Sequence, residues 1–372
     1  MTQAENQYFT LLRAALWETP VSIENEIDWA SVMQMAAHHG NNVLLSDVAS
    51  RMTGDNKPSP QMLASMQAEM RGNLFNQIKL RQILFSAVSL LRQHDIEPVV
   101  LKGFGLALLY RNPNLRQFGD IDLFVGLDNF HQACEVLRTL PGSYNWGEEM
   151  DAGKHYNLEF GNMAMEIHRV SADVSDAKEH ETYARIEHEG LSDHLQRVDL
   201  DGFEITLPSK EFVVFFTFFH AWHHFLTTGV GWRQLSDVAM ALHAYHGQLD
   251  TDQLRRWLVA MHLMQPWQTF GCLMVDCLGM PIEELPFYHA KAKRRVGKLY
   301  GLVMKEGNFK REQKFRGGKP KGRFWHRCQT FLRVFSDFFH LAKVFPEQAF
   351  REMIASLKQG MKKNVKKSGF FC

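Results

Sequence analysis

The sequence predicts an α/β (α+β) fold, in which a small mixed sheet carries helical additions on its N-terminal and C-terminal sides. Residues 1–95 have apolar residues at helical spacing, residues 96–207 contain short alternating runs, and residues 208–290 return to helical spacing. Residues 291–372 are basic, with interspersed aromatic residues. We therefore expect four regions with these boundaries: an N-terminal helical region, a sheet core, a helical domain and a basic C-terminal region.

The N-terminal region is expected to be helical throughout. In the stretch IDWASVMQMAAHHG, the apolar residues Trp29, Val32, Met33 and Ala36 would share one helical face. Gly40 follows as a C-terminal stop, because glycine accepts the left-handed conformation that commonly ends helices. A second, longer run with the same spacing precedes the sheet core.

The sheet core is expected to begin at Val99–Leu101, a short apolar run that follows Pro98. Residues 120–125, DIDLFV, alternate polar and apolar side chains as a strand does, and an amphipathic run after them predicts a helix. Three further alternating runs, YNLEF, AMEIHRV and GFEITLP, predict three strands within residues 156–207. The order of strands and helices favours a mixed sheet.

The helical domain is expected to begin after Ser209, which can cap a helix that has Glu211 in its first turn. The apolar spacing predicts helices in KEFVVFFTFFHAWHHFL, WRQLSDVAMALHAYH and TDQLRRWLVAMHLM. Beyond this domain, the polar, glycine-containing residues 305–327 predict a flexible loop, and residues 330–345 predict an amphipathic segment.

Charge is distributed unevenly along the chain. Residues 291–372 contain 22 Lys and Arg against 5 Asp and Glu, a balance of +17, whereas the first 290 residues carry a balance of −16. Such a basic region is either a solvated arm or a contact for an acidic partner, which leaves open RNA, anionic lipid, a phosphorylated substrate and the acidic body of the chain itself. The aromatic residues would stack on bases or insert at a membrane surface.

The sequence also excludes some classes of protein. Its start lacks the pattern of a secretion signal, and no stretch holds eighteen consecutive apolar residues. The five cysteines are odd in number and show no CxxC spacing, which argues against a disulfide framework and a structural zinc site. The expected location is the cytoplasm, with the inner membrane surface as an alternative for the basic region.

Two carboxylates on one strand are the main functional signal. Asp120 and Asp122 occupy alternate positions, so they would lie about 6 to 7 Å apart on the same face of the sheet. Their mutual repulsion favours a divalent cation, and Mg²⁺ prefers carboxylate and phosphate oxygens. Glu166, on a later predicted strand, is the best candidate for a third acid, which a pair of metals about 4 Å apart would need.

These residues carry a resemblance to a known superfamily. The passage resembles the DNA polymerase β-type nucleotidyltransferases, whose signature is a glycine after a strand, Asp-x-Asp on a second strand and an acid on a later strand. Within it the chain is similar to an uncharacterised bacterial nucleotidyltransferase family, type 5, in VVLKGFGLALLY, LRQFGDIDLFV, MEIHRV and GWRQLSDVAMALH. The resemblance covers about residues 25–245.

The resemblance implies a site for a nucleoside triphosphate beside the acids. It makes Asp120, Asp122 and Glu166 the catalytic, metal-binding acids, and it implies that the backbone at Gly103 approaches the phosphates. Members of the superfamily usually have Gly or Ser after that glycine, whereas this chain has Phe104. A side-chain phosphate contact at that position is therefore ruled out.

Two basic residues at family-matching positions would compensate for Phe104. Lys102 supplies a mobile point charge and Arg116 a planar fork for phosphate oxygens. We therefore predict that Lys102, Gly103 and Arg116 bind the nucleotide.

The resemblance implies a Mg²⁺-dependent nucleotidyltransferase, with Mn²⁺ as an alternative metal. It would move a nucleoside monophosphate from an NTP such as ATP to a hydroxyl acceptor by a two-metal mechanism. A different hypothesis is a nucleotide-binding scaffold that has lost catalysis and docks on membrane or RNA through its basic tail. A third keeps the enzyme but makes the acceptor a protein hydroxyl or an RNA end.

Five further residues are candidates for the acceptor side: His168, His220, His224, Arg233 and Asp237. His168 follows Glu166 by two residues and shares its face, which favours contact with substrate or with an acid. His220 and His224 are four residues apart on one helical face, but they lack the Glu of an HExxH zinc motif. Arg233 and Asp237 have the spacing of an ordinary helical ion pair, so their role in a cleft rests on the resemblance.

Overall fold

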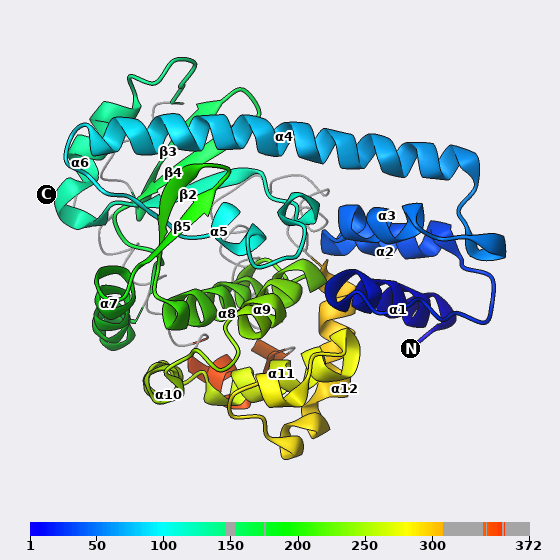
Figure 1. The fold of residues 1–372 in the computed structure, drawn as a ribbon. Helices are drawn as coiled ribbons and strands as arrows, with labels where there is room; N and C mark the ends of the chain where they lie inside the picture. Colours follow the sequence, from blue (N-terminus) through cyan, green and yellow to red (C-terminus); the bar gives the residue numbers. More distant parts are fainter. Residues whose placement is uncertain (146–152, 175, 308–337, 340, 352, 354–372) are drawn as a thin grey trace, which may run out of the picture.

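The computed structural model describes residues 1–145, 153–174, 176–307, 338–339, 341–351 and 353. A six-stranded mixed sheet lies at the centre of a largely helical chain (Figure 1), which confirms the predicted α/β class. The prediction of a loop at 305–327 falls mostly outside these residues, as does most of the predicted amphipathic segment at 330–345.

The sheet has the strand order β3-β4-β2-β1-β6-β5. Two pairs, β2 with β4 and β1 with β6, are parallel and the remaining neighbours are antiparallel. The strands are β1 (Val99–Val100), β2 (Asp120–Phe124), β3 (His155–Phe160), β4 (Met163–His168), β5 (Gln196–Leu200) and β6 (Phe203–Leu207). The sequence predicted three of the four strands after β2. It missed β5, a five-residue edge strand in which only Val198 and Leu200 are apolar.

One face of the sheet is covered by α4 (Pro60–Arg92) and α6 (Gly126–Leu137). The odd-numbered side chains of β2 and β4, including Ile121 and Leu123, are buried against these helices in one apolar cluster. In Figure 1, α4 crosses above the sheet, whereas α8 (Lys210–Thr227) lies below it. The even-numbered side chains of β2 and β4 therefore face the helices below.

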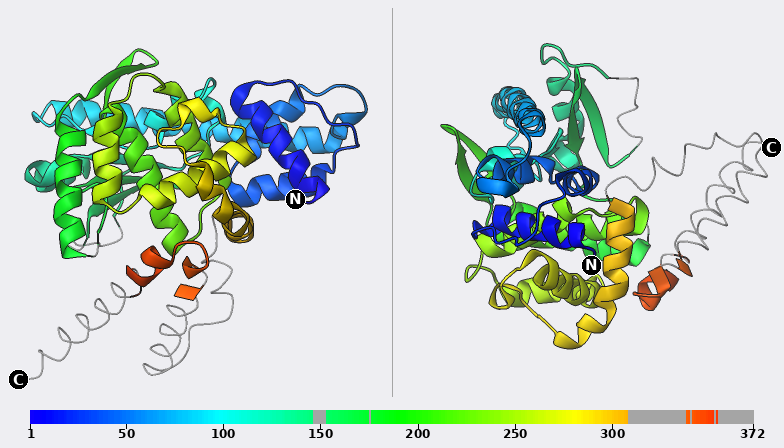
Figure 2. Two further views of the ribbon diagram at one scale, coloured as in Figure 1. Left: turned by 90° about the horizontal axis from the view of Figure 1, so that it is seen from below. Right: turned by 90° about the vertical axis from the view of Figure 1, so that its right-hand side faces the viewer.

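The first three helices are α1 (Gln3–Trp17), α2 (Trp29–His39) and α3 (Asn42–Ser50). The predicted stop at Gly40 is confirmed, because this residue ends α2 with φ of 75°. The ring centroids of Phe9 and Trp232 lie 4.7 Å apart, and Arg13 Nε donates to the carbonyl oxygen of Cys277 at 2.8 Å. The N-terminal helices thus share a core with the C-terminal helices, which lie beside them in Figure 2.

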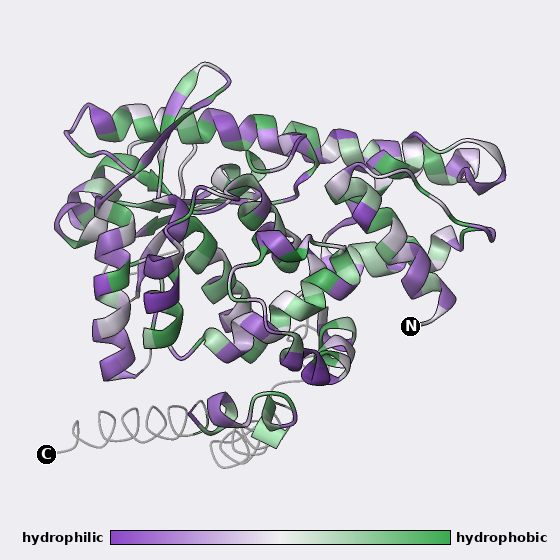
Figure 3. Ribbon diagram, turned by 60° about the horizontal axis from the view of Figure 1, so that its bottom comes forward, coloured by the Kyte–Doolittle hydropathy of each residue, from purple (hydrophilic) through white to green (hydrophobic). Residues whose placement is uncertain are grey.

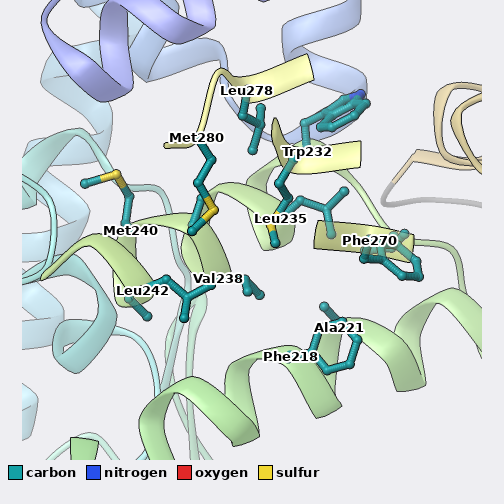
Figure 4. Close-up of a cluster of buried hydrophobic side chains, with 14 of the residues drawn as sticks. Phe218, Ala221, Trp232, Leu235, Val238, Met240, Leu242, Phe270, Leu278 and Met280 are labelled. Carbon is teal, nitrogen blue, oxygen red and sulfur yellow. The ribbon is translucent and has the colours of Figure 1, made fainter. Parts of the chain in front are cut away.

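The helical domain begins at the predicted position, where Ser209 Oγ accepts a hydrogen bond from the Phe212 amide at 3.2 Å. Figure 4 shows Phe218, Trp232 and Phe270 in its core, and Figure 3 shows apolar and polar faces on the helices. Its other helices are α9 (Trp232–Ala244), α10 (Thr251–Ala260), α11 (Met264–Leu278) and α12 (Lys293–Glu306); α7 (Ala177–Ser192) precedes β5. The four predicted region boundaries stay a prediction.

A short C-terminal segment, residues 341–351, packs on the helical domain. Phe345 is fully buried, with its ring centroid 5.2 Å from that of Trp222 and 6.1 Å from that of Phe270. This segment is drawn in red and orange in Figure 2. In the described part of the chain, the helices are too short or too polar to span a bilayer.

Candidate functional site

The parallel pairing of β2 with β4 brings the predicted acids onto one face. Asp122 lies directly opposite Glu166, Asp120 opposite Ala164, and Phe124 opposite His168. Paired residues and residues two apart project to the same side of a sheet, so all the acids share the face that looks toward the helical domain. Asp122 and His168 are both only 1% exposed, at the centre of this face.

Asp122 is the hub of the cluster. Lys102 Nζ lies 3.0 Å from Asp122 Oδ1, and His168 Nε2 lies 3.0 Å from the same oxygen. His168 Nε2 is also 3.2 Å from Glu166 Oε2, so this ring nitrogen bridges the two acids. The expected contact of His168 with an acid is therefore present. The second oxygen, Asp122 Oδ2, is buried and has no hydrogen-bond partner among the described residues.

The charges of the cluster depend on one another. Burial raises the pKa of a carboxyl, but at Asp122 the positive Lys102 and the hydrogen bond from His168 outweigh it, so its pKa is lowered. Burial opposes the charged form of Lys102, yet Asp122 raises its pKa above the ordinary value. Burial likewise opposes protonation of His168, but its hydrogen bonds to Asp122 and Glu166 raise its pKa. The shifts therefore favour the charged forms of Asp122, Lys102 and His168 together.

Asp120 differs from its neighbour. Burial and the charge of Asp122 raise its pKa, so its ionised form is under-neutralised. An excess of negative charge at Asp120 and an unpartnered oxygen on Asp122 are what a bound cation would relieve. These oxygen donors fit a hard divalent cation such as Mg²⁺.

Two residues that the sequence did not single out lie near the acids, and one of them, His155, belongs to this face. His155 pairs with His168 across β3 and β4, and its Nδ1 lies 3.5 Å from Glu166 Oε2. The ligand atoms of His155, Glu166 and His168 lie within 4.8 Å of one another. Burial lowers the pKa of Lys154; the positive charge of Lys102 lowers it further, and the negative charge of Glu166 opposes the shift. A hairpin register applied to HYNLEF and MEIHRV would have placed His155 here, whereas Lys154 precedes β3.

The turn at Gly103 reaches the start of β2. Gly103 has φ of 58° and ψ of −108°, a conformation that side-chain-bearing residues rarely adopt. A Cβ there would lie 3.3 Å from the carbonyl oxygen of Asp120 and 3.3 Å from the Phe118 ring. Phe104 is buried, with its ring centroid 4.8 Å from that of Phe118 edge to face, in the apolar cluster on the face of the sheet opposite the acids. The backbone of this turn and the strand acids are thus in close contact.

A family model described as an uncharacterised nucleotidyltransferase matches residues 25–279. The chain belongs to this nucleotidyltransferase family. The match spans the N-terminal helices from α2, the whole sheet and the helical domain through α11. Nucleotidyl transfer from an NTP to a nucleophilic acceptor is therefore its class of reaction.

Among solved structures, this nucleotidyltransferase is similar to the antibiotic-resistance factor ANT(2'')-Ia, at 14% identity and a TM-score of 0.35. That match covers 49% of this chain and 92% of the other. An antigenic nucleotidyltransferase-like protein from Paracoccidioides brasiliensis matches at 13% identity and a TM-score of 0.34, over 58% of this chain and 96% of the other. No curated protein matches the chain significantly.

The side chain of Arg116 in this nucleotidyltransferase is buried, and its guanidinium group is hydrogen-bonded to other residues of the protein. Its Nε and Nη2 donate to the two carboxylate oxygens of Asp237 at 2.7 and 2.9 Å, and its Nη1 donates to the carbonyl oxygen of Gly103 at 3.1 Å. Asp237 also accepts a hydrogen bond from the Tyr110 hydroxyl at 2.8 Å. The hydrogen-bond partners of Asp237 are therefore distant from it in sequence. Arg233, four residues before Asp237 on the same helix, instead donates to the carbonyl oxygen of Gln117 at 2.7 Å.

His220 and His224 form a pair on α8. Their Nε2 atoms lie 3.0 Å apart, and His224 Nδ1 lies 2.7 Å from Thr228 Oγ1. Burial lowers the pKa of His224 to about 4 and that of His220 well below its ordinary value; the charge of Lys102 adds to both shifts. The pair is therefore neutral at physiological pH, beside the lysine of the acid cluster.

A cavity of about 320 Å³ lies on the adjoining side of α8. Phe219, Trp222 and His223 line one wall of it, and Asp173 and Arg351 line others. The acids of β2 and β4 are not among its lining residues. The cavity and the acid cluster are thus separate features of the described residues, on neighbouring sides of one helix.

Proposed function

We propose that this nucleotidyltransferase is Mg²⁺-dependent and moves a nucleoside monophosphate from an NTP to a hydroxyl acceptor. The observation that carries the proposal is the parallel register of β2 and β4, which sets Asp122 opposite Glu166 with Asp120 on the same face. The adjoining Gly103 turn and Lys102 add a phosphate-binding backbone and a positive charge.

Asp120, Asp122 and Glu166 would hold the metal, because their carboxylates supply hard oxygen ligands on one face. Bound Mg²⁺ would neutralise phosphate charge and favour the ionised form of the acceptor oxygen. Mn²⁺ accepts the same ligands and is the expected substitute. His168 would stay as a partner of the acids, holding Asp122 and Glu166 in fixed orientations.

Lys102 and the Gly103 backbone would contact the triphosphate. The Lys102 side chain is 16% exposed and has a buried carboxylate behind it, so its ammonium group keeps its charge at the edge of the site. The backbone at Gly103 can approach a phosphate because it carries no Cβ. Arg116 lies behind this turn and would support it.

The transfer step forms one bond and breaks one bond. The acceptor oxygen bonds to the α-phosphorus, the bond from that phosphorus to the bridging oxygen breaks, and pyrophosphate leaves. Glu166 would take the acceptor proton, because it is the most exposed member of its cluster, at 26% of its side chain. His220 and His224 lie on the helical-domain side, where we place the acceptor.

A thermal-shift titration tests this function, because a ligand that binds only the folded state raises the melting temperature. Each of the four NTPs is added with and without Mg²⁺ to wild type, Asp122→Asn and Glu204→Gln. Glu204 lies on β6, away from the acids, and serves as the matched control. We expect a Mg²⁺-dependent shift in wild type and Glu204→Gln that is lost in Asp122→Asn. An equal shift in Asp122→Asn would contradict the site.

Two observations favour a second candidate, a nucleotide-binding scaffold without catalysis. Asp122 Oδ1 already has two positive partners, Lys102 and His168, and Phe104 departs from the superfamily pattern. Incubation with each NTP, Mg²⁺ and a cell extract as acceptor source separates the two. Pyrophosphate release that Asp122→Asn abolishes supports the enzyme, and nucleotide binding without release supports the scaffold.

The basic C-terminal region would serve an anionic partner in either case. Its balance of +17 suits anionic lipid, RNA or a phosphorylated substrate. A mass increase of one nucleotide on a partner protein, or on copurified RNA, would identify a macromolecular acceptor.

A further inference from the structure

We infer that Tyr110, Arg116 and Asp237 are positioning residues that fix the Gly103 turn for nucleotide binding. We call these three residues the clamp. The inference rests on the proposed function, because that function assigns the binding of the nucleotide phosphates to the Gly103 turn. It assigns Arg116 to the support of the turn, so that Lys102 and the backbone make the contact with the nucleotide.

The clamp is closed, since its polar atoms bond to one another. All three guanidinium nitrogens of Arg116 donate to protein oxygens, two to Asp237 and one to Gly103. Asp237 receives three hydrogen bonds, including one from Tyr110. The side chains of Arg116 and Asp237 are 6% and 5% exposed. A planar, bidentate arginine pair of this kind defines position and orientation together.

The clamp acts on a backbone that needs support. Gly103 has a left-handed φ of 58°, and its carbonyl oxygen is the acceptor that Arg116 Nη1 holds. The Cα of Gly103 is packed so closely that an added Cβ would lie 3.3 Å from the Asp120 carbonyl oxygen. A shift of this turn would therefore move the phosphate-binding backbone relative to the first metal-binding acid.

The loop that carries Arg116 is anchored from the outside. Gln77 on α4 donates to the Arg116 carbonyl oxygen at 2.7 Å, and Asn73 donates to that of Asn114 at 2.7 Å. The Gln117 side chain accepts from the Val43 amide on α3 at 3.2 Å. Helices before and after the sheet thus converge on the loop, and Asp237 on α9 connects the helical domain to the nucleotide side.

The test compares two tyrosine variants that lose the same group. Tyr110→Phe removes the hydroxyl that donates to Asp237. Tyr8→Phe removes an equally buried hydroxyl, which accepts from Asn41 Nδ2 at 3.1 Å in the N-terminal helices. We measure the Kd for the Mg²⁺ complex of the NTP that wild type prefers, by calorimetry, together with the melting temperature and amide hydrogen exchange of residues 102–105.

We expect Tyr110→Phe to weaken nucleotide binding about threefold, as the loss of one hydrogen bond would. Arg116→Lys, which keeps the charge but loses the fork, should weaken it about tenfold. Tyr8→Phe should change the melting temperature only. Exchange at residues 102–105 should be faster in Tyr110→Phe than in Tyr8→Phe.

Unchanged Kd and unchanged exchange in Tyr110→Phe would overturn the inference while leaving the proposed function in place. Equal weakening in Tyr8→Phe and Tyr110→Phe would also overturn it, since the effect would then be general. A wild type that binds none of the four NTPs would instead overturn the proposed function and the nucleotide role with it. In that case faster exchange specific to Tyr110→Phe would still support the effect of the clamp on the turn.

Discussion

Two buried ionic clusters lie on either side of the Gly103 turn, and they are built differently. In the clamp, the carboxylate oxygens of Asp237 and the guanidinium nitrogens of Arg116 are all paired. In the acid cluster of Lys102, Asp122, Glu166 and His168, one oxygen of Asp122 has no partner within the described chain, and neighbouring Asp120 repels the other acids. The first cluster is complete without a ligand and the second is not.

The difference separates support from chemistry. A closed network defines one arrangement, because every broken contact would leave a buried charge unpaired. A cluster with an unpartnered oxygen and an under-neutralised acid is a candidate for binding a ligand or a metal ion. We therefore assign positioning to the clamp and metal binding to the acids, and the following variants test that assignment.

The largest expected effect comes from opening the clamp. Arg116→Met leaves the buried Asp237 carboxylate without its cation and should lower the free energy of unfolding by about 3–5 kcal/mol. Urea denaturation measures the loss. Arg51→Met is the matched control, because Arg51 pairs with Asp47 at 2.8 Å but is 59% exposed, so the loss there should stay below about 0.5 kcal/mol. Similar losses in the two variants would show that the clamp is not a buried pair of this strength.

The opposite effect is expected in the acid cluster. Burial and the charge of Asp122 raise the pKa of Asp120, so its ionised form destabilises the metal-free fold at neutral pH. Asp120→Asn should therefore stabilise the metal-free protein by about 0.5–1 kcal/mol while it abolishes Mg²⁺-dependent NTP binding. Asp193→Asn, at an exposed position, controls for the loss of one negative charge. If Asp120→Asn were less stable than wild type, that would contradict the view that the ionised Asp120 carboxylate destabilises the metal-free protein.

The smallest effect on NTP binding is expected at a third buried polar group, which lies away from both clusters. His39 is fully buried, both of its ring nitrogens lack partners among the described residues, and burial lowers its pKa to about 3. Between about pH 6.5 and 3 the unfolded chain binds a proton there that the folded protein does not, so stability falls as pH falls. His39→Leu should reduce this slope and leave NTP binding unchanged. Urea titrations at several pH values measure it, with exposed His94→Leu as control.

An unchanged slope in His39→Leu would show that His39 is not neutral in the folded protein. Altered NTP binding in that variant would contradict the assignment of His39 to a structural role away from the nucleotide site.

The fold could be predicted where local pattern decides it. Alternation placed β2 and β4, and Gly40 and Ser209 marked helix ends that the structure confirms. The pattern missed β5, because this edge strand has only two apolar residues, Val198 and Leu200, and so short an alternation resembles a polar loop. It was also silent on the packing of Phe9 against Trp232, since such contacts form between segments far apart in the chain.

The site shows the same limit. Strand spacing was enough to bring Asp120 and Asp122 to one face, whereas the place of Glu166 opposite Asp122 depends on the pairing of β2 with β4. The helical spacing of Arg233 and Asp237 suggested an ion pair with each other, but Asp237 pairs with Arg116, 121 positions away. His155 was missed because its place opposite His168 depends on the register of β3 with β4. Register and long-range pairing are tertiary properties that one-dimensional periodicity does not contain.

The most direct test of metal binding by the acids of β2 and β4 is a Mn²⁺ titration. The electron paramagnetic resonance signal of the free ion reports how much Mn²⁺ remains unbound. Mn²⁺ is titrated into wild type and Asp120→Asn, with and without a non-hydrolysable NTP analogue. Mn²⁺ should bind wild type, bind more tightly with the nucleotide, and fail to bind Asp120→Asn. Binding that is absent from wild type, or that is the same in Asp120→Asn, would contradict the claim that the acids of β2 and β4 hold the metal.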